Sequence, residues 1–130
     1  MSEYVAPVRD MQFVLKELAG LDQVAQLPGY EEATPDLIDA VLEEAARFAE
    51  EVLSPLNWPG DQEGARWHDK TVVMPAGFKD AYKLFADSGW TALANEPEWG
   101  GQGLPKVVAA AVGEMGKSDN HSFSLCPLLT

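Results

Sequence analysis

The chain is poor in cysteine, in basic residues and in long apolar runs. Its 130 residues include one cysteine, Cys126, which excludes an internal disulfide and favours a reducing compartment. Only 9 Lys and Arg stand against 21 Asp and Glu, so the net charge of -12 argues against nucleic acid and against an anionic membrane as partners. Residues 107–112 form the longest apolar stretch, too short to span a bilayer, and residues 1–4 do not begin a secretory signal. We therefore expect a cytoplasmic protein.

The remaining composition is that of one folded domain. Hydrophobic residues make up 46% of the chain, and 130 residues are enough to enclose a core. There is no internal repeat and no low-complexity segment. Apolar residues first recur at helical spacing over about residues 8–19, and Gly20 suits the end of that helix. A connector over residues 21–33 with a Pro-Gly turn follows.

The clearest helical pattern begins at Thr34. Thr34 is a good N-cap, Pro35 suits the first helical position, and Asp36 is favourable near the positive end of the helix dipole. An apolar stripe then runs to about residue 53, with glutamates on the opposite face. We interpret these glutamates as a solvated surface in preference to a metal site or a docking face.

Proline and glycine interrupt the pattern over residues 54–74, which we expect to be irregular. A strand over residues 70–73 is conceivable but has no obvious partner. Another helix should begin at Pro75 and end at Gly89, with Trp90 packing over its end. For all four tryptophans, core packing is the expectation.

A glycine-rich turn over residues 95–105 leads into a helix that is apolar on almost every side, which predicts a central place in the bundle. Gly116 is expected to end it, and Asp119 or Asn120 to cap a last helix starting near residue 121. That last helix is apolar and has no closing signal before residue 130. Because an exposed apolar face costs about 25 cal/mol per Å², we expect that the chain is truncated.

No catalytic motif is complete. Residues 113–118 end like a phosphate-binding loop but lack its first glycine, and the glycines of residues 100–103 do not have dinucleotide-binding spacing. His68, expected in a loop, and His121 are not at metal-ligand spacing, and Cys126 reads as a small buried side chain. The residues alone therefore predict an acidic helical domain without an assigned chemistry.

Several segments carry a family resemblance. Residues 95–105 read Asn-Glu-Pro-Glu-Trp-Gly-Gly-Gln-Gly-Leu-Pro, which resembles the Pro-Glu-aromatic-Gly-Gly-x-Gly loop in the N-terminal helical domain of acyl-CoA dehydrogenases. Residues 4–15 resemble an N-terminal extension found in one bacterial subgroup of that family. Residues 53–64, 75–82, 89–90 and 120–125 are similar to the same subgroup, in the same order.

The resemblance implies an all-α fold, an orthogonal helical bundle over residues 34–130 that is incomplete at its C-terminal end, preceded by a helical extension over residues 1–33. It also implies an FAD-dependent enzyme that desaturates acyl-CoA thioesters, assembles as a homodimer or tetramer and passes electrons to an electron-transfer flavoprotein. The flavin site and the catalytic glutamate would lie beyond residue 130. This chain would then hold no catalytic, cofactor-binding or metal residue and would be inactive alone.

One wall of the acyl pocket is what the resemblance assigns to the last helix. Phe123, Ser124 and Pro127 share one face at helical offsets and are the candidate substrate-binding residues. The alternative is that these three residues pack only within the bundle. Two other functions also stay open: a stand-alone helical domain that binds an acyl chain or a protein, and a split enzyme whose partner chain brings flavin and base.

Overall fold

The computed structural model describes residues 4–129. Residues 1–3 of the predicted N-terminal extension and residue 130 of the predicted bundle lie outside the described residues. The described part is mostly helical, which confirms the predicted all-α class. In chain order its elements are α1 (Val8–Phe13), η1 (Val14–Leu18), α2 (Leu21–Val24), α3 (Pro35–Phe48), η2 (Ala49–Leu53), α4 (Ser54–Glu63), β1 (Arg66–His68), β2 (Thr71–Val73), α5 (Phe78–Asp87), η3 (Trp90–Ala92), η4 (Pro97–Trp99), α6 (Lys106–Asp119) and α7 (His121–Leu129).

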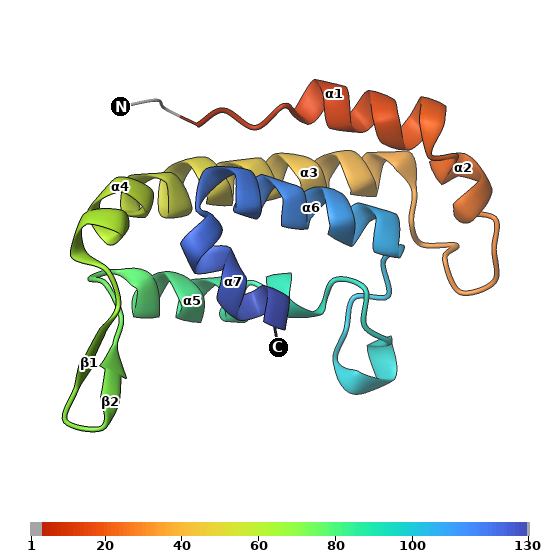
Figure 1. Ribbon diagram of the computed structural model, residues 1–130. Coiled ribbons are helices and arrows are strands. Elements are labelled where there is room, and N and C mark those ends of the chain that lie inside the picture. Colours follow the sequence, from red (N-terminus) through yellow and green to blue (C-terminus); the bar gives the residue numbers. More distant parts are fainter. Residues whose placement is uncertain (1–3, 130) are drawn as a thin grey trace.

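The helix α6 is central, as its apolar sequence predicts. It contacts α3, η2 and α7, and α1 packs on α3 (Figure 1). The helix α7 turns back from the end of α6 and also touches α4. Within residues 4–129, no helix is both long enough and apolar enough to cross a bilayer.

Two groups of buried side chains form the core. The larger joins Ile38 and Leu42 of α3 to Val108 and Met115 of α6, and Leu21 of α2 belongs to it. The smaller lies where α7 meets η2 and α5; its members are Leu53, Phe78, Ala81 and Phe123. Because residues of the N-terminal extension share the larger core, the extension is packed into the bundle; the boundary between residues 33 and 34 stays a prediction.

Thr34 caps α3 as predicted. Its backbone is extended, with φ -68° and ψ 151°, and its Oγ1 accepts a hydrogen bond of 3.3 Å from the N–H of Leu37. Pro35 occupies the first turn, where no intrahelical N–H is needed.

The change Thr34→Ala should lower the free energy of unfolding by about 1 kcal/mol, because it removes the acceptor for one end-of-helix N–H. Thr34→Ser keeps a hydroxyl and should stay within a few tenths of a kcal/mol of the parent. Thermal denaturation of the two variants measures the difference. Equal losses for alanine and serine would show that the cap contributes nothing.

The expectation of an irregular segment after residue 53 was wrong for residues 54–63. The helix α3 continues through the π-helical turn η2 into α4, and Pro55 falls in the first turn of α4, where proline is tolerated. Gly60 is buried against α5: a side-chain carbon there would lie 2.6 Å from the Phe78 ring. Packing of α4 on α5 therefore outweighs the proline and glycine signals.

The predicted strand near residues 70–73 does have a partner. β1 and β2 pair antiparallel, with Trp67 opposite Val72, and the hairpin projects from the helices (Figure 1). Asp69 and Lys70 make its tip with φ of 45° and 62°, a left-handed conformation that non-glycine residues seldom adopt. The turn was missed because it carries no glycine, and His68 consequently lies in a strand instead of a loop.

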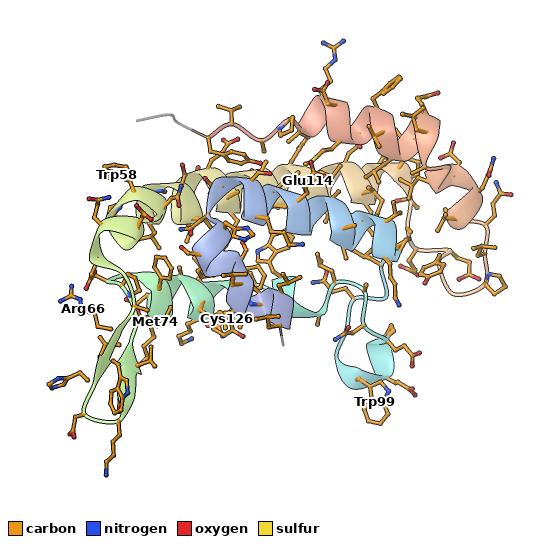
Figure 2. The ribbon with its side chains drawn as sticks, viewed as in Figure 1. Trp58, Arg66, Met74, Trp99, Glu114 and Cys126 are labelled. Atoms are coloured by element: carbon orange, nitrogen blue, oxygen red, sulfur yellow. The ribbon has the colours of Figure 1, made fainter. Side chains whose placement is uncertain are left out.

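Three of the four tryptophans do not pack in the core, contrary to expectation. Trp58, Trp67 and Trp99 are 62%, 66% and 80% exposed, and Figure 2 shows Trp99 at the tip of its loop. Trp90 is the exception, with its ring centroid 6.3 Å from that of Phe48.

Candidate functional site

The corner between α6 and α7 is held by Asn120, a fully buried residue. Its Oδ1 accepts hydrogen bonds from the Phe123 N–H at 3.1 Å and the Ser122 hydroxyl at 3.0 Å, so it caps α7. Its Nδ2 donates to the carbonyl of Leu53 at 3.1 Å and ties α7 to η2. One of the two predicted cap residues, Asn120, is therefore the cap.

Gly116 does not end α6, contrary to expectation, because the helix runs on to Asp119. Its role is steric: a side-chain carbon at Gly116 would lie 3.0 Å from the Ser124 hydroxyl oxygen. The missing side chain lets α7 cross α6 at close range. Ser124 is buried at this crossing.

A cavity of about 340 Å³ lies beside this crossing. Phe123, Ser124 and Pro127 all line it, so the structure brings together the three residues chosen from the sequence. Residues of α6 and of the segment that follows α5, among them Gly113 and Trp90, also line it. The volume is at the small end of the range for ligand sites.

The floor of the cavity is made of buried apolar side chains. Phe123 is 3% exposed, and its ring meets those of Phe78 and Phe85 edge-on at centroid distances of 6.0 and 5.9 Å. Leu53 and Leu93, both buried, complete the floor. Phe123 thus takes part in the core packing and also faces the cavity.

The residues missed by sequence reasoning come from other elements. Phe85, Trp90 and Lys117 line the cavity but share no sequence pattern with α7. One signal was available: Ala109, Val112, Gly113 and Gly116 recur at helical offsets on α6, and small residues at such offsets leave room against a neighbouring helix.

The glycine-rich loop fixes one rim of the cavity. Gly103 N–H bonds to Asn95 O at 2.9 Å, and Leu104 N–H to Leu93 O at 2.9 Å. A side-chain carbon at Gly101 would lie 2.0 Å from Asn95 O, so only glycine fits there. The loop holds residues 93–95 in place at the cavity.

A larger hollow of about 440 Å³ lies along α3. Val41, Phe48 and Trp90 line it, but so do Glu44 and Glu51. Carboxylates are costly next to an aliphatic chain. The cavity at α7, which no carboxylate lines among the described residues, is the better candidate for an apolar ligand.

The comparisons with known proteins identify relatives of one kind. No model of a known protein family matches the chain. The 3-methylmercaptopropionyl-CoA dehydrogenase of Ruegeria pomeroyi is 49% identical over 127 residues, which cover 98% of this chain and 22% of that protein. The chain is homologous to acyl-CoA dehydrogenases. The resemblance seen in its motifs is confirmed.

Two further acyl-CoA dehydrogenases are more distant. The broad-specificity linear acyl-CoA dehydrogenase FadE5 of Mycobacterium tuberculosis is 29% identical over 88% of the chain and 19% of that protein. The butyryl-CoA dehydrogenase of Syntrophomonas wolfei is 26% identical over 98% of the chain and 21% of that protein. The chain therefore spans about a fifth of the length of each relative.

A polar cluster connects the end of α6 with η2 and the N-terminal segment. Asp119 is 4% exposed, and its pKa is raised to about 6, first by burial and also by the nearby Glu50, while a hydrogen bond from Ser54 acts in the lowering direction. Glu50 Oε1 accepts a hydrogen bond of 2.9 Å from the N–H of Ala6. Burial and the charges of Asp119, Glu114 and Glu50 raise the pKa of Tyr4.

This cluster is structural in character. It joins the N-terminal segment to η2 and to the end of α6. Among residues 4–129, no group of three or more His, Cys, Asp and Glu side chains is arranged to hold a metal.

Cys126 lies on α7 (Figure 2) and is exposed. The expectation that Cys126 is a small buried side chain was wrong, because α7 turns this face away from the core.

Proposed function

We propose that this chain is the N-terminal part of an FAD-dependent acyl-CoA dehydrogenase and supplies one wall of its acyl pocket. The observation that carries the proposal is the cavity of about 340 Å³ that Phe123, Ser124 and Pro127 line together. Homology to dehydrogenases whose printed names specify acyl-CoA substrates supports it.

The proposed wall of the acyl pocket positions the substrate and takes no part in the reaction itself. Apolar floor residues bind an aliphatic chain by removing it from water, and the crossing at Gly116 fixes how wide the slot is. Binding of this kind cannot lower a chemical barrier alone. FAD held by other parts of the enzyme would supply the hydride acceptor for an α,β-desaturation, and a base elsewhere in the enzyme would take the proton.

The finer features belong to the same proposal. The substrate is an acyl-CoA in fatty acid metabolism, the acceptor an electron-transfer flavoprotein, and the complete enzyme a cytoplasmic homodimer or tetramer. The share of about a fifth that the chain spans in its relatives supports a longer polypeptide.

The test uses the open reading frame that encodes these residues. We expect a product several times longer, yellow from bound FAD, whose flavin absorbance bleaches on addition of an acyl-CoA. In that protein, Gly113→Leu should raise KM for acyl-CoA about tenfold, a loss of about 1.4 kcal/mol of binding, with unchanged FAD content. The leucine would fill the cavity, since a side-chain carbon at Gly113 meets only the Lys117 ammonium, at 3.8 Å.

Ala110→Leu is the matched control. It adds a similar side chain to an exposed position of the same helix, outside the cavity. It should leave KM unchanged. A stop codon directly after Thr130, or equal effects of the two leucines, would count against the proposal.

A stand-alone acyl-binding domain is the second candidate, favoured by two buried apolar clusters and a cavity within one chain. It predicts a monodisperse 130-residue monomer that melts cooperatively. Co-purification of a second, yellow polypeptide would instead indicate the split enzyme.

A further inference from the structure

The N-terminal arm, residues 4–7, precedes α1 and lies over η2 and the end of α6 (Figure 1). Ala6 is 8% exposed, and its N–H donates the hydrogen bond of 2.9 Å to Glu50 Oε1. Tyr4 is partly buried, and its hydroxyl lies in range of the carboxylates at the end of α6. The arm is therefore held down at two points, Ala6 and Tyr4.

Three carboxylates meet under the arm. Asp119 and Glu114 belong to α6 and Glu50 belongs to η2, and the charges of all three act on the Tyr4 hydroxyl. Asp119 is 4% exposed and is also opposed by the Glu50 charge, while Ser54 of α4 gives it a hydrogen bond. A buried carboxylate close to other carboxylates is costly to ionise unless a cation compensates it.

Such a cation is missing among residues 4–129. Arg9, Lys117 and His121, the basic residues closest in sequence to the arm and to Asp119, are exposed. None of the ion pairs formed by the described residues involves any of the three carboxylates. Ionisation of Asp119 therefore costs free energy as long as the arm covers it.

Two oxygens at this contact also lack hydrogen-bond partners. The Tyr4 hydroxyl and Oδ2 of Asp119 are buried, and neither forms a hydrogen bond within the described part of the chain. Burying a polar atom without a partner costs free energy, and the cost disappears when water reaches the atom. Release of the arm would hydrate both oxygens, so docking of the arm is weaker than its burial suggests.

The arm can open without the rest of the fold. Downstream of it, Met11 and Leu15 are buried in the larger core and fix the N-terminal extension there. A short segment held by few buried groups opens locally with a small free energy. Opening of residues 4–7 thus leaves α1 and η1 in place.

We propose that the N-terminal arm is a pH-dependent strap, which is docked over η2 and the end of α6 while Asp119 is protonated and is released as Asp119 ionises. The proposal is independent of what the cavity beside α7 binds. It assigns the buried carboxyl of Asp119 a role in controlling the extension.

The direction of the pH dependence follows from burial. With the arm docked, the pKa of Asp119 is raised to about 6, first by burial, and hydration on release returns it toward 3.8. Below pH 4 both states hold the proton, so docking has its full stability. From pH 4 to 6 the ratio of released to docked arm should rise about tenfold per pH unit, up to about 100-fold, and then stay constant.

Hydrogen–deuterium exchange of the polypeptide that the open reading frame encodes measures the release. Mass spectrometry follows the peptide that contains Ala6 from pH 4 to about pH 7, and each rate is divided by the intrinsic exchange rate at that pH. The protection of the Ala6 amide should fall about tenfold per pH unit up to pH 6. At each pH it should be lower than that of the Ile38 and Leu42 amides in α3, which open with the core.

Asp119→Asn removes the titrating group and keeps its shape. In this variant the protection of the Ala6 amide should stay at its low-pH value across the whole range. Asp61→Asn, at an exposed position on α4, is the matched control and should keep the parent's profile.

Glu50→Gln and Glu50→Ala test the fastening of the arm. Both changes remove the charge, but only glutamine keeps an acceptor for the Ala6 N–H. Protection of the Ala6 amide should therefore be about fivefold lower in Glu50→Ala than in Glu50→Gln. Equal protection in the two variants would show that this hydrogen bond does not hold the arm.

The remaining outcomes decide the role of Asp119. Protection of the Ala6 amide that does not change with pH, or that changes equally in the parent and in Asp119→Asn, overturns the strap. Protection equal to that of the α3 amides also overturns it, because the arm would then open only with the whole fold.

Discussion

Asn120→Ala should lower the free energy of unfolding by about 3 kcal/mol. The change removes the cap of α7, worth about 1 kcal/mol. It also leaves the buried Leu53 carbonyl without the hydrogen bond from Asn120 Nδ2, at a cost of about 1–3 kcal/mol. Urea denaturation, extrapolated linearly to water, measures the loss.

Asn120→Ser divides the effect into its parts. A serine is a good cap for the Phe123 N–H but is too short to reach Leu53, so the loss should fall to about 2 kcal/mol. A cost for Asn120→Ala below about 1 kcal/mol would show that the corner is no more than a surface cap.

Asp119→Asn should stabilise the fold above pH 6, by up to about 3 kcal/mol. The pKa of Asp119 is raised from 3.8 to about 6, chiefly by burial, so the folded state favours the neutral carboxyl. For each pH unit between these two values, the wild type loses about 1.4 kcal/mol of its free energy of unfolding. The loss therefore builds up as the pH rises from 4 to 6. Asparagine has a similar shape and no charge.

The gain should therefore be near zero at pH 4, grow up to pH 6 and stay constant above it. Thermal and urea denaturation of wild type and variant across this range give the difference directly. Asp61→Asn, at an exposed position on α4, is the matched control and should not follow this profile. A difference that does not change with pH would contradict burial of the Asp119 charge.

The helices with clear local signals were predictable. The cap at Thr34 and the apolar stripe of α3 come from neighbouring residues, and so does the central place of α6. The sequence gives no such local signal for α4, because its prolines and its glycine argue against a helix. The helix is stabilised instead by the packing of Gly60 against Phe78 of α5. That contact joins residues distant in sequence, so local propensity cannot reveal it.

The candidate site was likewise predictable only in part. Phe123, Ser124 and Pro127 share a face of α7 because of helical spacing, which a sequence shows. Lys117 and Trp90 reach the cavity only because α7 folds back over α6 at Gly116. That crossing joins residues of two helices at the Asn120 corner, and helical spacing within one helix does not reveal it.

The anchoring of α7 at one end has a consequence for the shape of the cavity. Asn120 and Ser124 hold its first turn, whereas Leu125, Leu128 and Leu129 are 42%, 54% and 81% exposed. Side chains with few buried neighbours are displaced at a smaller free-energy cost than side chains in a packed core. The lining beside Phe123 is therefore the part held most firmly, so branched or bulky tails should be rejected there first.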